Sequence, residues 1–128
     1  MLHLLYECRY VEKCINRFNN LPESLIDNLF ESSIKYSQEC QEYWADLGID
    51  LDDEEIITKS NVKNNISPSL LIINEKPLDG DIVLSLELNC SWEDEHGMEW
   101  LIKGNNILYV GAYEGISTLH IPEEGNHA

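Results

Sequence analysis

The chain has 128 residues and carries 24 acidic against 8 basic side chains, a formal net charge of −16 at pH 7. Repulsion among so many like charges destabilises the compact state. The same charge argues against direct binding of DNA or RNA, whose phosphates are also negative. The apolar fraction of 43%, with three Trp and six Tyr, is too high for a disordered acidic tail, so we expect a single domain over residues 1–128.

The first part of that domain, about residues 3–65, has helical patterning. Apolar residues recur every three or four positions from Leu4 to Phe18, which predicts a first helix with one apolar stripe. After Asn19-Asn20, Pro22 opens a second helix that Gly48 ends. Its apolar face includes Leu25, Leu29, Tyr36, Cys40, Tyr43 and Leu47. The short connection predicts that the two helices pack antiparallel.

A third, short helix is expected from Asp52 to about Lys63. Asp52 and Asp53 suit its N-cap and first turn, where the helix dipole favours negative charge. Part of the acidic run therefore has a structural explanation, with contact to a partner as the alternative.

The second part, about residues 69–121, has strand patterning. Leu70 to Ile73 is a short apolar run after Pro68 and predicts a buried strand. Residues 82–92 alternate with period two, which is typical of a long strand with one buried face. Further strands are expected over 98–103, 107–110 and 116–121. The class is therefore α+β, with antiparallel helices on one face of a mainly antiparallel sheet of about four strands.

The segment Trp92 to Gly97 lies between the two best strand patterns and is expected to be their hairpin connection. It places three adjacent acids before His96 and Gly97, and Gly97 is expected at positive φ. His96 beside Glu95 has the composition of a carboxylate-held general base. We favour the interpretation that His96 is a turn histidine that hydrogen-bonds nearby backbone, and that His96 and Gly97 are both structural residues of the turn.

The cysteines do not indicate a metal or disulfide framework. Cys8, Cys14, Cys40 and Cys90 are widely spaced and form no CxxC pair, which fits buried thiols in a reducing cytoplasm. Zinc requires ligands at short spacing, and only Cys90 and His96 lie near each other. No run approaches the about 20 apolar residues that span a bilayer. We expect a cytoplasmic protein with no metal, no cofactor, no membrane contact and no enzymatic activity.

The acids concentrate after residue 35, where nineteen acids face four bases. Such a surface suits a positively charged protein partner. The candidate contact residues are Glu39, Glu42, Asp46, Asp50, Asp52, Asp53, Glu54, Glu55, Glu93, Asp94 and Glu95. Trp44 is the candidate aromatic anchor within them, because aromatic side chains dominate binding hot spots. Tyr43 is expected in the helix core.

The residues Cys90-Ser91-Trp92-Glu93 and Asp94-Glu95-His96-Gly97, followed by a strand that closes on Tyr109-Val110-Gly111, resemble an uncharacterised bacterial domain family. Its signature is a W-[DE]-x-E-H-G hairpin, and the resemblance covers about residues 10–113. Members resemble the immunity proteins of polymorphic and contact-dependent growth inhibition toxin systems. The resemblance implies a protein that binds a cognate toxin domain in the cytoplasm and blocks it.

Three functions remain open from the sequence. The leading one is an immunity protein that neutralises a basic, nuclease-type toxin through its acidic surface. The second is a small enzyme or metal-binding protein centred on His96. The third is an acidic adaptor or secretion-chaperone-like protein whose helical part offers an apolar groove.

Overall fold

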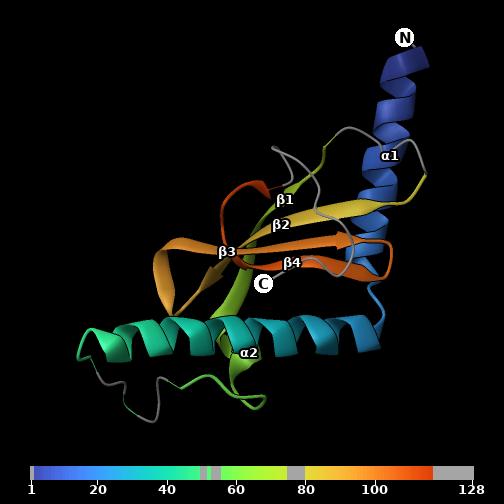
Figure 1. The fold of residues 1–128 in the computed structure, drawn as a ribbon. Helices are drawn as coiled ribbons and strands as arrows, with labels where there is room; N and C mark the ends of the chain where they lie inside the picture. The colour runs from blue at the N-terminus through green and yellow to red at the C-terminus, as the bar shows by residue number, and fades with distance from the viewer. Residues whose placement is uncertain (1, 50–51, 53–55, 75–79, 117–128) are drawn as a thin grey trace.

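The protein folds into two helices followed by a four-stranded sheet (Figure 1). The computed structural model describes residues 2–49, 52, 56–74 and 80–116. The elements in chain order are α1 (Leu2–Asn19), α2 (Glu23–Asp46), the 3₁₀ helix η2 (Val62–Asn65), β1 (Ile66–Ile72), β2 (Val83–Cys90), β3 (Glu93–Lys103) and β4 (Asn106–Ala112). Each strand pairs antiparallel with the next in the order β1-β2-β3-β4. The predicted α+β class is confirmed.

Both helices contribute to one core on one face of the sheet. The period of two in β2 and β3 sends alternate apolar side chains to that face. The buried core combines Tyr10 and Cys14 of α1 and Leu25, Leu29 and Tyr36 of α2 with Leu84, Leu86, Leu88, Cys90, Met98, Trp100, Ile102 and Val110 of the sheet. In the part of the chain that the structure describes, no helix is long and apolar enough to cross a membrane.

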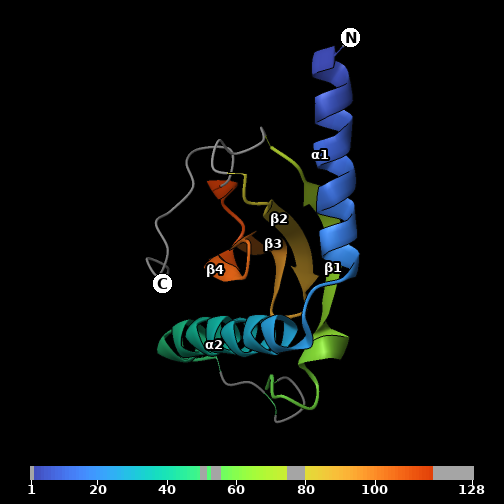
Figure 2. The same cartoon turned by 90° about the vertical axis from the view of Figure 1, so that its right-hand side faces the viewer.

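The helices differ from the expected arrangement in how they meet. In both views α1 and α2 run in clearly different directions and do not lie side by side (Figures 1 and 2). Instead α1 packs against β2 and α2 packs against β4. The sheet covers the apolar stripe of each helix, so neither stripe needs the other helix as its partner.

The first strand is longer and more exposed than predicted. β1 includes Pro68 and is an edge strand, and Leu70 is 53% exposed, so the prediction of a buried strand is wrong. The register of β1 against β2 shifts between Pro68 and Leu70. Proline lacks the N–H that a central strand must donate, which restricts it to edges and bulges.

The third helix expected from Asp52 does not form over the described residues 56–61, and only Val62–Asn65 makes a 3₁₀ turn. The side chain of Asn61 explains this. Its Oδ1 accepts a hydrogen bond from the Thr58 N–H, and its Nδ2 donates to the Ile56 carbonyl, both at 2.8 Å. Such bonds from side chain to backbone compete with helical ones. Of the strand expected at 116–121, residues 117–121 lie outside the described residues, and Ile116 is not in a strand.

One buried polar contact fixes α2 on the centre of the sheet. The Trp100 indole N–H donates to Ser33 Oγ at 3.0 Å, and Ser33 Oγ donates to the Leu29 carbonyl at 2.7 Å. The ring of Phe30 contacts Trp100 edge-on, with centroids 6.2 Å apart. Buried tryptophan N–H groups are generally hydrogen-bonded, and Trp100 has its acceptor in Ser33.

We therefore predict that Ser33→Ala lowers the free energy of unfolding by about 1–3 kcal/mol, because it leaves a buried N–H without an acceptor. Urea unfolding followed by far-UV circular dichroism measures this. The matched control is Ser32→Ala, at a half-buried position of the same helix. Equal stability of the two variants would contradict the anchoring role of Ser33.

Candidate functional site

The turn between β2 and β3 consists of Ser91 and Trp92, so the expectation that residues 92–97 form the connection is wrong. Cys90 pairs with Glu93, and Leu88 pairs with Met98. Residues 94–97 of β3 therefore stand opposite a single residue of β2. A bulge of this kind ends regular pairing and redirects side chains.

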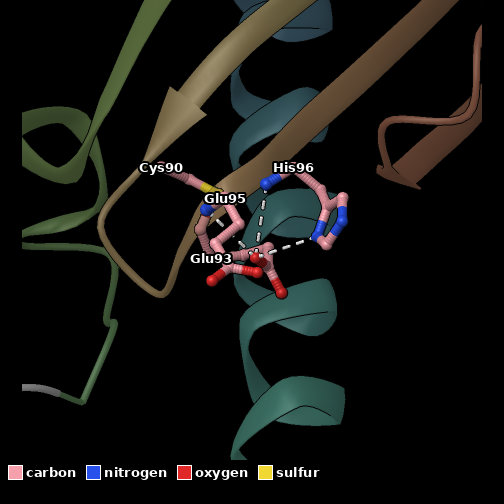
Figure 3. A network of polar contacts seen from close by, with 4 residues as sticks. All are labelled: Cys90, Glu93, Glu95 and His96. Atoms are coloured by element: carbon pink, nitrogen blue, oxygen red, sulfur yellow. Dashed lines mark hydrogen bonds and ion pairs between the residues drawn. The ribbon is translucent and has the colours of Figure 1, made fainter.

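Glu93 organises this bulge. Its Oε1 accepts hydrogen bonds from the backbone N–H groups of Glu95 at 3.3 Å and His96 at 3.4 Å (Figure 3). The same oxygen lies 3.4 Å from His96 Nδ1. The carboxylate that contacts the histidine is thus Glu93 and not Glu95. The His96 side chain is 69% exposed, so no enclosed environment surrounds the candidate general base.

Gly97 completes the bulge and has the positive φ expected from the sequence, 73°. A Cβ at this position would lie 2.6 Å from the Leu88 carbonyl oxygen. Glycine is therefore required here for two reasons, the backbone conformation and the close approach of β2.

The turn before β3 packs against the C-terminal half of α2. The rings of Tyr36 and Trp92 meet edge-on with centroids 6.0 Å apart, and Figures 1 and 3 show the hairpin beside this part of α2. Burial raises the pKa of the Cys40 thiol, and the negative charges of Glu93 and Glu39 raise it further. The two acidic segments predicted as partner contacts, far apart in sequence, are therefore neighbours.

We call this region the acidic end and define it by Glu39, Glu42 and Asp46 of α2 and Glu93, Asp94 and Glu95 of β3. All six are exposed except Glu93, which is half-buried. Residues 36–58 and 77–102 contain no Lys or Arg. Of the other candidate contacts, Asp52 is exposed, whereas Asp50, Asp53, Glu54 and Glu55 lie outside the described residues.

The opposite end of the sheet carries basic side chains. The Arg17 guanidinium of α1 donates to the Gly104 carbonyl at 3.0 Å and to Asn105 in the turn between β3 and β4. Arg9 and Lys13 precede it on the same helix. Figure 1 shows α1 and this turn on the right and the hairpin between β2 and β3 on the left. α1 also carries the exposed acid Glu12, so this end has charges of both signs, whereas α2 has no Lys or Arg after residue 35.

The two aromatic residues near the end of α2 are exposed differently from the prediction. Tyr43, expected in the core, is 61% exposed, whereas Trp44 is half-buried. Their rings meet edge-on with centroids 5.7 Å apart. Tyr43 is therefore the more accessible of the two.

The thiols near the acidic end are poorly suited to nucleophilic chemistry. Burial raises the pKa of Cys90 to about 12, so its thiol stays protonated at neutral pH and lacks the thiolate that reacts. Its Sγ donates to the Glu93 carbonyl at 3.7 Å (Figure 3). Within the described ranges, no group of three or more His, Cys, Asp or Glu side chains is arranged to hold a metal ion.

Glu99 is a residue whose importance the sequence did not reveal. Its side chain points to the other face of the sheet from that of Trp100, and it is fully buried. Its Oε1 accepts backbone N–H groups from Glu114 at 3.1 Å, Gly115 at 3.0 Å and Ile116 at 3.3 Å. An acid that alternates with core residues on a strand normally indicates a solvated face, so no local signal distinguishes this one. It anchors the segment after β4.

Gly97→Ala tests the close approach in the bulge. The matched control Gly104→Ala also has positive φ, 59°, but a Cβ there meets no atom within 4 Å. We expect Gly97→Ala to destabilise by about 1–3 kcal/mol more than Gly104→Ala, because only the former adds overpacking to the conformational cost. Thermal unfolding of both variants measures the difference, and equal melting temperatures would contradict the observed register.

Glu99→Gln tests the buried carboxylate. Glutamine keeps one oxygen acceptor but places an NH2 group where the buried Glu99 Oε2 has no hydrogen-bond partner. A buried donor left unsatisfied costs about 1–3 kcal/mol, and we expect a loss of this order together with faster hydrogen exchange at residues 114–116. The control is Glu87→Gln, because Glu87 lies directly across from Glu99. Removing a like charge at that position is expected to keep or raise stability. A loss of similar size in both variants would show that Glu99 has no anchoring role.

Comparison with known proteins places the chain in a family but adds no function. No curated protein and no solved structure matches it. A family model, described as a domain of unknown function (DUF6985), matches residues 7–117. That range includes α2, all four strands, the acidic end and Glu99. The chain therefore belongs to the DUF6985 family.

Proposed function

We propose that this chain is an immunity protein, which binds a cognate bacterial toxin domain in the cytoplasm and neutralises it through the acidic end. The observation that carries the proposal is the meeting of two acidic segments, one from α2 and one from β3, on one end of the fold. The resemblance of the 92–97 motif to immunity-type families supports the same function.

The partner proposed is a basic protein domain of nuclease type. Nucleases bind phosphates through cationic clefts, and exposed carboxylates held on a rigid helix and strand are complementary to such a cleft. Because α2 carries no Lys or Arg after residue 35, no positive charge on this part of the helix opposes the approach of such a cleft. Steered association of this kind reaches on the order of 10⁸ M⁻¹s⁻¹ at low salt.

An enzyme centred on His96 receives less support. The ring is mostly exposed, and its carboxylate neighbour Glu93 already accepts two backbone N–H groups that hold the bulge. A general base requires a substrate proton within reach and a carboxylate that orients the ring. Here the carboxylate has a structural task instead.

The test uses the product of the gene adjacent to the one encoding this chain. If the proposal is correct, the two proteins co-purify, and cells that produce the neighbour survive only when this chain is present. Glu39→Lys with Glu42→Lys should then slow association by about tenfold and flatten its dependence on salt. Stopped-flow binding at several salt concentrations measures both effects.

The matched control has the same change of net charge at a distance from the acidic end, Glu12→Lys with Glu23→Lys on exposed positions of α1 and the start of α2. An equal effect of the two pairs would show that net charge alone governs association. A neighbour that neither binds nor is neutralised would refute the immunity function.

A further inference from the structure

The apolar stripe of α2 continues beyond the part of the helix that the sheet covers. Leu29 and Tyr36 are buried, and Cys40 is half-buried. Tyr43 and Leu47, at the next steps of three and four along the same face, are 61% and 58% exposed. Residues at this spacing share one side of a helix, so the side of α2 that packs in the core is exposed to solvent at its C-terminal end.

The reason is the relative length of the elements. In Figure 1 the C-terminal end of α2 extends past the hairpin between β2 and β3. Beyond that point no described strand lies against the helix. Ile49, which follows the helix, is 47% exposed. We call Tyr43, Trp44, Leu47 and Ile49 the uncovered stripe.

The described charged residues of α2 beside the uncovered stripe are all acidic. Glu39, Glu42 and Asp46 lie among its residues on α2, and all three are exposed. Exposed apolar groups clustered beside charged ones mark binding sites on soluble proteins. The group that best satisfies both components is an arginine side chain, because a guanidinium pairs with carboxylates and also stacks on Tyr or Trp rings.

We propose that the uncovered stripe is the docking surface for a protein segment that presents apolar side chains flanked by arginines. Tyr43 and Leu47 supply the apolar contact, the Tyr43 and Trp44 rings supply faces for guanidinium groups, and Glu39, Glu42 and Asp46 pair with them. The positive charge of the partner comes from the proposed function, on which this inference rests.

The probe is a synthetic helical peptide with leucines on one face and arginines beside them. Matched peptides carry lysine or glutamate in place of every arginine. Fluorescence anisotropy gives the dissociation constants, and NMR chemical shifts of backbone amides locate the contact. We expect the arginine peptide to shift residues 39–49, the lysine peptide to bind several-fold more weakly, and the glutamate peptide not to bind.

Two double variants of the full chain separate the stripe from general hydrophobicity. Tyr43→Ser with Leu47→Ser should raise the dissociation constant of the arginine peptide by at least about tenfold, as for residues at the centre of an interface. Val11→Ser with Ile15→Ser removes apolar groups on α1 that are 36% and 43% exposed, and should change the dissociation constant by less than about twofold.

The inference is overturned if the arginine peptide does not bind, or if it binds the Tyr43/Leu47 variant as well as the wild type. It is also overturned if light scattering shows a dimer of this chain that only this variant abolishes, since the occupant would then be a second copy. If the peptide experiments fail but the neighbouring gene product still binds, only the inference about the uncovered stripe is refuted. If the peptide binds but no toxin is neutralised, only the proposed immunity function is refuted.

Discussion

The position of α2 on the sheet determines most of what the surface presents, and the Trp100–Ser33 hydrogen bond is the contact that sets it. Apolar packing alone is non-directional, so a leucine-rich helix face has several acceptable placements on a leucine-rich sheet. A buried N–H that must find its acceptor removes that freedom. With Ser33 fixed above Trp100 and the Tyr36 ring against Trp92, the C-terminal half of the helix lies beside the hairpin, and the carboxylates of α2 come to lie near those of β3.

The hairpin contributes its own constraint through Glu93 and Gly97. Regular pairing of β2 and β3 would alternate Asp94, Glu95 and His96 between the two sheet faces. The bulge interrupts this alternation, because the Glu93 carboxylate holds the N–H groups of Glu95 and His96 and Gly97 admits the Leu88 carbonyl at close range, and all three side chains are exposed. One acid of the motif is thus structural, and its neighbours are left exposed. The fold, and not the sequence spacing alone, creates the acidic end.

Patterns that depend on local physics were readable from the sequence. The α+β class and the positive φ of Gly97 followed from spacing and residue type. The position of β2 did so as well, but the prediction of one buried face was wrong, because Val83 and Ser85 on its second face are also buried. One failure had a local cause that the charge argument for Asp52 and Asp53 omits: the Asn61 side chain bonds backbone groups three and five residues before it, and no helix forms there. Two others depended on tertiary context: β1 is an edge strand, and Tyr43 is exposed because α2 extends past the hairpin. Glu99 was invisible for a related reason. Its three N–H partners come from a segment that only the folded chain brings beneath it.

The two helices carry charges of opposite sign near their C-terminal ends. This contrast bears on the role of the acids of α2. A helix C-terminus carries partial negative charge and favours bases in its last turn. α1 follows this rule with Arg17, which also bonds the turn between β3 and β4. α2 has no base in its last turn and carries Glu42 and Asp46 near that end. These carboxylates oppose both the helix dipole and one another, so they weaken the isolated fold. The positively charged partner that we propose would relieve both repulsions on binding.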